Sequence, residues 1–583
     1  MILEDIKKNK AVFAFLSVFT VVLLTLFLVR LTHGVGTTDE AFYCITGYRL
    51  LKGGVPFGDM WETIATTSYF MLPFLLVRSI FVSNADGIEL FLRVCFFLFN
   101  FITAYCIYLY AGKTIKKSYA YILGLLFLVY APYRIYNFSY NNLANAFVMI
   151  TIAMVVLGRD SGKKRFFFIT GVAMACAILS YPTHAYLCGI LTLFIFISEF
   201  RKKRFVNPFI YALGGISVAI PIVIHIVSNT GFSTMLKNIG TAVNTDTAHN
   251  VFITSFLRHF FYSFTFLLEP FVRDGIPFIL IYAAMIVLAI LKKTRKYVKL
   301  IIPAYLFLSG VFTLNSFYFD AIERMFLIHV VILIPIIVMI SQDKKAMLKK
   351  VALEWGLAFV HYNIISFTSG GVAYQGVHAL IVATVVTMKL YCETLDEEDL
   401  GRYKSGLAYV SIIYLIGFEM MAYYGYSFNE NQFPKLTARV DIGVFKGIYT
   451  SPERKQYIED LERALDKAAD PGESVLVLYH NCSIYLMLGD MVTKTPSTWG
   501  CYDYTLYEVD NEQLFLDYLS IEENIPDNII IVDEPDDFDY GDKVKYYVYW
   551  YPALNDYVVN NYTLVGDFEE GMSDSILKFE RNK

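Results

Sequence analysis

Charged residues are scarce in this sequence. Of its 583 residues only 17% are charged, 56% are hydrophobic, and the mean hydropathy is +0.49. Because a soluble globular domain carries roughly a quarter charged residues, an ordinary soluble enzyme is excluded. The sequence also lacks C-x-x-C pairs and histidine clusters with zinc spacing, so a structural zinc site of the common types is excluded. In their place it has long apolar runs, which indicate a polytopic α-helical membrane protein.

Thirteen of these runs are about long enough to cross the roughly 30 Å hydrocarbon core of a membrane. They lie at residues 11–31, 88–111, 118–135, 141–158, 166–184, 185–200, 206–228, 275–291, 299–316, 325–341, 351–369, 372–391 and 405–424. Three further apolar stretches, 41–51, 68–82 and 251–268, are interrupted by charge or aromatic polarity. We expect these three to be interfacial or re-entrant helices.

Basic residues predict the orientation of the spans. Residues 1–429 contain 36 Lys and Arg, and 26 of them gather at every second junction, at residues 7–10, 113–117, 159–165, 201–204, 292–299, 344–350 and 389–404. By the positive-inside rule these junctions are cytoplasmic, and so is the N-terminus. An odd number of spans then places the C-terminal residues outside. The protein is therefore expected in the plasma membrane, and abundant Lys, Ile and Tyr with four Trp favour a bacterial source.

The charge changes sign near residue 427, which we take as a domain boundary. Residues 430–583 hold 13 Lys and Arg against 30 Asp and Glu, a net charge of −17. This acidic segment argues against nucleic-acid binding. A helix opened by Ser451-Pro452 is followed by an apolar strand at 474–479, a helix near 511–520 and strands at 528–532, near 544–550, at 561–568 and at 575–580. The pattern predicts an extracytoplasmic α/β domain at 427–583, after a transmembrane domain at 1–426.

Two adjacent carboxylates, Asp39 and Glu40, follow the first span in an outer loop at residues 32–87. Carboxylates at the mouth of a membrane bundle are costly to desolvate, so they either face water or have a function. The alternative is that they only cap the helix that follows, since acidic side chains stabilise a helix N-terminus. An amphipathic helix is expected at 41–52, ended by Gly53-Gly54, and Asp59 and Glu62 then add two more carboxylates.

The run from Asp39 to Glu62, DEAFYCITGYRLLKGGVPFGDMWE, followed by an apolar helix and by Arg93 in the first turn of the second span, resembles the first outer loop of GT-C superfamily glycosyltransferases. That superfamily includes protein O-mannosyltransferases and the bacterial aminoarabinose transferases that modify lipid A. The resemblance implies a multi-span enzyme that uses a polyprenyl-phosphate sugar donor. It also implies Asp39 as the catalytic base, with Glu40 beside it.

A second match is the stretch from Arg324 to His329, continuing to Pro335, which is similar to an R-x-x-x-x-H stretch before a late span in such enzymes. Two features depart from the family pattern. Thr63-Ile64-Ala65-Thr66-Thr67 stands where relatives often carry a Pro-Pro-Leu turn, and Asn137–Asn142 stands where an acidic residue is common. A divalent metal held by carboxylates of both loops is possible in the family, but these residues do not predict one here.

Glycosyl transfer with inversion needs a base for the acceptor hydroxyl and a cation for the departing phosphate. Asp39 suits the first role. Arginine binds two phosphate oxygens at once, so the candidates for the second are Arg324, Arg258 and Arg273, with His329 and His184 behind them. Arg258 has the alternative of snorkelling to lipid headgroups, Arg273 of pairing with Asp274, and His184 of hydrogen-bonded packing.

These features predict an enzyme that transfers a sugar from a polyprenyl phosphate to a lipid, glycan or protein acceptor on the outer face of the membrane, with Asp59 and Glu62 supporting the acceptor or the first loop. Apart from the divalent metal possible in the family, no cofactor is considered. Two other classes remain. A polysaccharide polymerase or flippase is also polytopic, but a flippase is expected to carry ionisable residues within its spans. A non-catalytic membrane scaffold needs no carboxylate pair in its first loop.

Overall fold

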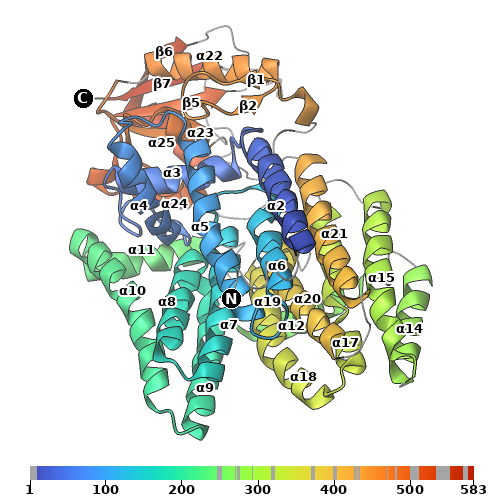
Figure 1. The fold of residues 1–583 in the computed structure, drawn as a ribbon. Helices are drawn as coiled ribbons and strands as arrows, with labels where there is room; N and C mark the ends of the chain where they lie inside the picture. Colours follow the sequence, from blue (N-terminus) through green and yellow to red (C-terminus); the bar gives the residue numbers. More distant parts are fainter. Residues whose placement is uncertain are drawn as a thin grey trace.

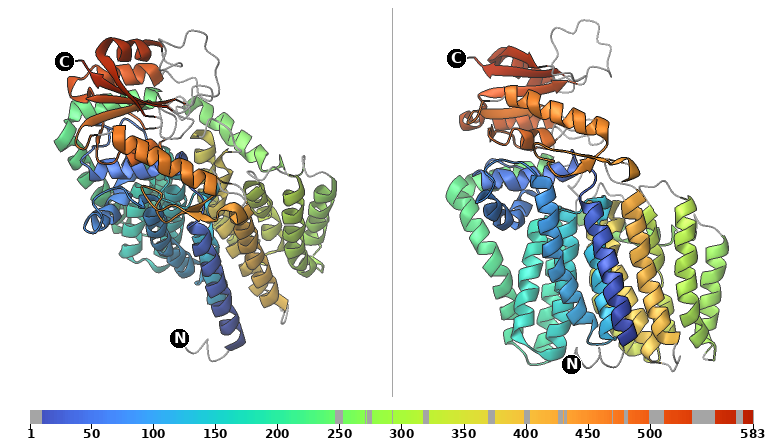
Figure 2. Two further views of the ribbon diagram at one scale, coloured as in Figure 1. Left: turned by 90° about the horizontal axis from the view of Figure 1, so that it is seen from above. Right: turned by 45° about the horizontal axis from the view of Figure 1, so that its top comes forward.

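A computed structural model describes residues 10–245, 253–269, 271, 276–291, 293–316, 322–368, 375–397, 403–425, 430, 433–468, 470–478, 482–498, 511–533, 552–568 and 575–582. The described chain forms a bundle of long helices with a smaller α/β layer across one end (Figure 1). The first described residues lie at the opposite end of the bundle from this layer (Figure 2).

Within the described residues, eight helices are long and apolar enough to cross a membrane. Helices coincide with all thirteen predicted spans, but several are shorter than expected or interrupted. The bundle consists of α2 (Lys10–Leu31), α5 (Ile88–Ala111), α6 (Lys117–Val129), α7 (Tyr140–Ser161), α8 (Lys164–Ser180), α9 (Ala185–Arg201), α10 (Val206–Thr230), α14 (Ile276–Ile290), α15 (Arg295–Ser316), α16 (Ile322–Val331), α17 (Ile334–Ile340), α18 (Lys344–Lys350), α19 (Gly356–Thr368), α20 (Leu380–Asp396) and α21 (Tyr403–Gly425).

The interruptions have local causes. The run predicted at 325–341 is divided into α16 and α17, and Pro335 stands in the first turn of α17. Proline has no N–H to donate, so it is favoured in the first turn of a helix, where that N–H would have no partner within the helix. The run predicted at 118–135 gives the short helix α6, after which the chain turns through the 3₁₀ turn η2 (Pro132–Arg134).

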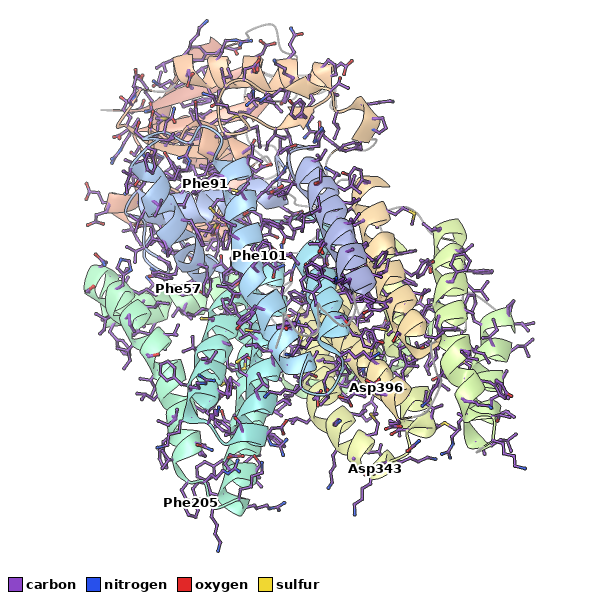
Figure 3. The ribbon with its side chains drawn as sticks, in the orientation of Figure 1. Phe57, Phe91, Phe101, Phe205, Asp343 and Asp396 are labelled. Carbon is purple, nitrogen blue, oxygen red and sulfur yellow. The ribbon has the colours of Figure 1, made fainter. Side chains whose placement is uncertain are left out.

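The basic junctions gather at the end of the bundle away from the α/β layer. Phe205 and Asp343, which lie beside the basic stretches 201–204 and 344–350, both appear at that end (Figure 3). Alternate loops therefore lie on one side, as the charge pattern predicted.

A network of acidic and basic side chains lies inside the bundle. Lys389 of α20 contacts Glu354 at 2.8 Å and Glu393 at 2.9 Å, and Lys350 contacts Glu393 at 2.7 Å. Glu354 lies in a π-helical turn, η4 (Val351–Trp355), and also accepts a hydrogen bond from Tyr110 of α5. Sequence patterns did not predict this cluster, because its members become neighbours only when α5, η4 and α20 pack.

The first outer loop differs from its expected form. Helix α3 (Asp39–Leu51) begins and ends near the predicted limits, but the residues from Glu40 to Leu50 are all buried. It is therefore not an amphipathic helix lying on the membrane surface, as expected for 41–52. It lies between α5, α4 (Ser68–Ser79) and the α/β layer (Figure 1). Its polar stripe is covered because that layer packs on it.

The C-terminal residues form the predicted α/β structure. A five-stranded sheet has the order β4 (Val492–Thr493), β3 (Ser474–Leu478), β5 (Asn528–Asp533), β7 (Ser575–Arg581) and β6 (Tyr562–Phe568). Strand β3 is parallel to β4 and β5, whereas β7 is antiparallel to both of its neighbours. The strand expected near 544–550 lies outside the described residues.

Successive residues of β3 alternate between two hydrophobic cores, one on each face of the sheet. Val475 and Val477 belong to a core shared with the helical bundle, whereas Leu476 and Leu478 belong to a second core with α24 (Asn511–Leu519) and α25 (Pro552–Asn561). Successive strand residues face opposite sides of a sheet, so one apolar strand fills both cores. The predicted helix is α22 (Pro452–Ala468), and the Ser451 hydroxyl accepts a hydrogen bond from the Arg454 backbone N–H at 3.2 Å, as a cap.

A buried carboxyl group lies where α22 meets the bundle. Glu462 is 8% exposed, and Asp466 and Asp86 lie near it. Burial, reinforced by these two negative charges, raises the pKa of Glu462 to about 8 from an ordinary value of 4.5. Lys446 also contacts Asp86, at 3.1 Å.

Glu462→Gln is expected to stabilise the protein at pH 8 relative to wild type by roughly 1–3 kcal/mol, with little gain at pH 4.5. The folded protein holds a proton on Glu462 that the unfolded chain releases between pH 4.5 and about 8, so wild-type stability falls as pH rises through this window. Thermal unfolding of both proteins in detergent at several pH values measures the difference. If the difference in melting temperature between Glu462→Gln and wild type were the same at pH 5 and at pH 8, Glu462 would not be held protonated in the folded protein.

Candidate active site

The site is built at the end of the bundle that carries the α/β layer, where the chain leaves α2 and begins α3. Asp39 is the first residue of α3 and is partly exposed. Burial of its carboxyl group raises the pKa of Asp39 to about 7. A carboxyl group with this pKa is a proton acceptor near neutral pH, which a helix-capping role alone does not require.

Tyrosines surround Asp39. Its carboxyl group interacts electrostatically with the phenol groups of Tyr43, one turn along α3, and of Tyr140, the first residue of α7. The two tyrosine rings meet edge to face with centroids 5.7 Å apart. Burial raises the pKa of Tyr43 well above its ordinary value, so this phenol stays protonated and can donate a hydrogen bond.

Glu40 has a different environment from its neighbour. Both of its carboxylate oxygens accept hydrogen bonds from Arg93, each at 2.7 Å, and the side chain is 4% exposed. Arg93 also contacts Glu89, one turn earlier in α5, at 2.6 Å. This bidentate pair leaves Glu40 tied to α5. It positions the start of α3, and the partly exposed Asp39 is left as the carboxylate open to a substrate.

The chain between α2 and α3 is fixed by the same arginine. Arg93 donates to the backbone carbonyls of Leu31 and Gly34, at 2.9 and 2.7 Å. Gly36 lies so close to Glu40 that a Cβ atom there would be 2.6 Å from a carboxylate oxygen. Any larger residue at this position would therefore push the Glu40 carboxylate out of its pair with Arg93.

The α/β layer also holds this segment. Glu430, the one described residue between α21 and residue 433, accepts hydrogen bonds from the Val35 backbone N–H at 2.8 Å and from Thr450. Arg454 of α22 donates to the Thr37 hydroxyl at 3.2 Å, and the Ser483 backbone N–H donates to the Thr37 carbonyl. Residues on both sides of the domain boundary therefore set the position of Asp39.

A small pocket lies beside the Glu40–Arg93 pair. Of the charged side chains that line it, three are the arginines Arg30, Arg93 and Arg134 and one is Glu40. Arg30 donates to the Tyr423 carbonyl at 2.8 Å and lies over the Tyr423 ring. Glu89 pairs with Arg93, and Glu430 acts electrostatically on Arg30, so three carboxylates accompany the three arginines.

Asp59 and Glu62 both act within the first loop. An Asp59 oxygen accepts a hydrogen bond from the Val55 backbone N–H at 3.0 Å and closes a turn. A Glu62 oxygen accepts one from the Thr498 backbone N–H at 2.7 Å, and the adjacent Trp61 N–H donates to the Pro496 carbonyl. These contacts favour support of the loop and of the α/β layer over contact with an acceptor.

The structure describes the side chains of three of the five predicted phosphate-binding residues. His184 is fully buried, with Nδ1 3.1 Å from the Tyr181 carbonyl and Nε2 2.8 Å from His361 Nδ1, so both ring nitrogens are occupied. His329 is buried in α16 beside the Tyr305 hydroxyl, at 2.9 Å. Arg258 is exposed on α12 (Ile253–Phe266), whereas Arg273 and the side chain of Arg324 lie outside the described part of the chain.

A comparison of the sequence with known protein families tests the family resemblance. Residues 66–227 match the family model of the dolichyl-phosphate-mannose-protein mannosyltransferases. The matched segment runs from η1 (Ala65–Thr67) through most of α10, so it begins just after the first-loop motif. The resemblance to the GT-C superfamily is confirmed, and it implies a membrane glycosyltransferase of the GT-C type. No curated protein matches the chain.

The second outer loop does not fit a metal shared with the first. Asn137 stands in place of an acidic residue, and its amide donates to Glu40 at 3.2 Å, while Arg93 occupies both Glu40 oxygens. Across the described residues, no three His, Cys, Asp or Glu side chains are grouped so that they could hold a metal ion.

Sequence reasoning missed several residues of this site. Glu89 carried a signal, because it lies four residues before Arg93 on the same helix face. Glu430 carried none, since its partner Val35 is distant in sequence, and Arg134 reaches the pocket only through the fold. Tyr140 lies within Asn137–Asn142 and carried no signal of its own, because its position beside Asp39 depends on how α7 packs against α3.

Proposed function

We propose that this protein transfers a sugar from a polyprenyl-phosphate donor to a hydroxyl of a lipid, glycan or protein acceptor on the outer face of the plasma membrane. The observation that carries the proposal is Asp39, a partly exposed carboxyl group at the start of α3 whose pKa is raised to about 7 by burial. The family match over residues 66–227 supports the reaction class.

In the proposed reaction Asp39 accepts the proton of the acceptor hydroxyl as its oxygen attacks the anomeric carbon. The bond between that carbon and the phosphate oxygen breaks, and polyprenyl phosphate leaves with the bonding electrons. Attack from the face opposite the phosphate inverts the anomeric configuration. Tyr43 and Tyr140 flank the base, and the Glu40–Arg93 pair fixes where it stands.

The developing negative charge on the departing phosphate needs a cation. We propose Arg324 for this role, on its position in the R-x-x-x-x-H stretch, with Arg273, Arg258 and His329 as the further candidates. His184 is left out, because both of its ring nitrogens are already hydrogen-bonded. The N-terminus is proposed to be cytoplasmic, and the α/β domain at 427–583 extracytoplasmic.

Purified protein in liposomes is expected to release polyprenyl phosphate from a labelled polyprenyl-phosphate sugar and to form a glycoside of inverted anomeric configuration. Proton NMR coupling constants of the product distinguish inversion from retention. A retained configuration would contradict single displacement with Asp39 as base, because retention requires an even number of inversions. Absence of product with any donor would contradict the proposed function.

A flippase is the second candidate, and the network of Glu354, Lys389 and Glu393 inside the bundle is what favours it. Ionisable groups within membrane spans often line transport pathways. The same liposomes separate the two activities, because a flippase moves the labelled lipid between leaflets without forming a glycoside. A scaffold does neither.

A further inference from the structure

The corner of the second outer loop has an unusual backbone. Tyr133 and Arg134 are adjacent and have φ angles of 53° and 60°, in the left-handed region that non-glycine residues rarely adopt. Among the described residues only Phe57 and Lys203 share this property without being glycine. Strain of this kind persists where the surroundings enforce it, and it concentrates at functional sites.

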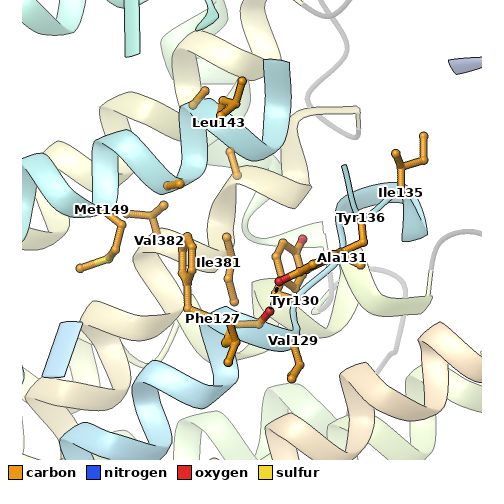
Figure 4. Close-up of a cluster of buried hydrophobic side chains, with 14 of the residues drawn as sticks. Phe127, Val129, Tyr130, Ala131, Ile135, Tyr136, Leu143, Met149, Ile381 and Val382 are labelled. Atoms are coloured by element: carbon orange, nitrogen blue, oxygen red, sulfur yellow. Dashed lines mark hydrogen bonds between the residues drawn. The ribbon is translucent and has the colours of Figure 1, made fainter. Parts of the chain in front are cut away.

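The surroundings do enforce it. The Tyr130 hydroxyl donates to the His378 carbonyl at 3.0 Å, and the Asn142 amide donates to the carbonyls of Ile135 and Asn137 at 2.9 and 2.7 Å. Behind the corner, Tyr130 and Tyr136 pack among apolar side chains that include Phe127, Ile381 and Val382 (Figure 4). The corner is therefore clamped from both sides by buried structure.

The side chains of the two strained residues lie in different parts of the site. Arg134 lines the pocket that also contains Arg30 and Arg93. Tyr133 is partly exposed, and its ring packs against His378 with centroids 4.8 Å apart. Its phenol interacts electrostatically with those of Tyr43 and Tyr140, which are the two tyrosines beside Asp39.

Tyr133, Tyr140 and Asp39 are thus three partly exposed side chains around one region at the mouth of the bundle. Tyr140 is held from behind by Tyr43 and by Tyr181, whose ring centroid is 5.3 Å away. Rigid aromatic rings with polar tips suit a sugar, whose ring has apolar C–H faces and hydroxyl edges. The strain at Tyr133 has an explanation if its ring must stand at this place.

We propose that the corner of the second outer loop binds a pyranose ring against Tyr133 and Tyr140, next to Asp39. The inference rests on the proposed function, since a sugar must lie beside the base for transfer to occur. The ring bound here belongs either to the donor sugar or to a sugar acceptor, which present the same chemistry. Tyr133 is a specificity-determining residue on this view.

The test compares Tyr133→Phe, Tyr133→Ala and Tyr133→Gly in the full-length protein, with labelled polyprenyl-phosphate hexose and a glycan acceptor. Loss of the ring in the Ala and Gly variants is expected to raise the KM of one of the two substrates about tenfold, while kcat changes less. The Phe variant keeps the ring and is expected to stay near wild type. A raised donor KM assigns the ring to the donor, and a raised acceptor KM assigns it to the acceptor.

Tyr133→Gly separates binding from strain, because glycine adopts this backbone conformation freely. A purely structural tyrosine predicts that the Gly variant keeps both KM values, and that result would overturn the proposal. Lys203→Gly is the matched control, since it relieves a positive φ of 59° at the other end of the bundle and should leave both KM values unchanged.

Direct binding of the labelled donor and acceptor is measured on the same proteins, which keeps this inference distinct from the proposed function. Wild-type protein that binds a sugar substrate but does not transfer it would reject the transferase and still report on Tyr133. Equal binding by wild-type and Tyr133→Gly proteins would reject the pyranose site even if the transferase is active.

Discussion

Asp39→Asn is expected to lower the turnover of sugar transfer by about 10²- to 10⁴-fold, the usual contribution of a general base. Asparagine has nearly the shape of aspartate and is as well tolerated at a helix start, so the fold and substrate binding should be kept. Turnover is measured with a labelled polyprenyl-phosphate sugar in liposomes, and thermal unfolding confirms that the variant is folded.

The pH dependence adds an independent check on the base. Burial raises the pKa of Asp39 to about 7, and only the deprotonated form accepts a proton. The wild-type rate should therefore increase as pH rises through about 7 and level off above it, and the residual activity of Asp39→Asn should lack this step. Asp59→Asn is the matched control, because Asp59 lies in the same loop and closes a turn with Val55. Near-normal turnover in Asp39→Asn would remove Asp39 from the chemistry.

The second large effect is expected for Arg93→Met, which leaves Glu40 and Glu89 buried without their cation. Removing one partner of a buried ion pair costs about 3–5 kcal/mol, because the remaining charges stay desolvated. The variant should unfold at a lower temperature in detergent and lose transfer activity. Arg93→Lys should recover only part of the stability, since an ammonium group lacks the planar fork that binds both Glu40 oxygens.

A triple variant separates charge from position. Arg93→Met combined with Glu40→Gln and Glu89→Gln removes the uncompensated charges, so it should regain much of the stability but not the activity. Lys389→Met is the matched control, because it breaks a comparable buried network with Glu354 and Glu393 at another place in the bundle. If Arg93→Met melted like wild type, the pair would not be what holds the start of α3.

Sequence patterns alone determined much of this protein. Apolar runs predicted where helices lie, because a span must bury about twenty residues in hydrocarbon wherever it packs. The basic junctions predicted which loops share a side. The strand that begins at Ser474 and the helix opened by Ser451-Pro452 were readable from local rules. The pair Asp39 and Glu40 was singled out by its place after the first span, and Asp39 within the pair by the family resemblance.

The tertiary structure decided what each polar residue does. Asp39 and Glu40 are neighbours in sequence, but packing of α5 against α3 pairs Glu40 with Arg93 and leaves Asp39 partly exposed. Helix α3 has an amphipathic sequence, and only the docking of the α/β layer buries it. Tyr133 and Arg134 carry no signal in sequence, because their left-handed conformations are imposed by contacts with residues far along the chain. Hydropathy and charge act locally or through the membrane, whereas these roles depend on which side chains meet when separate helices pack.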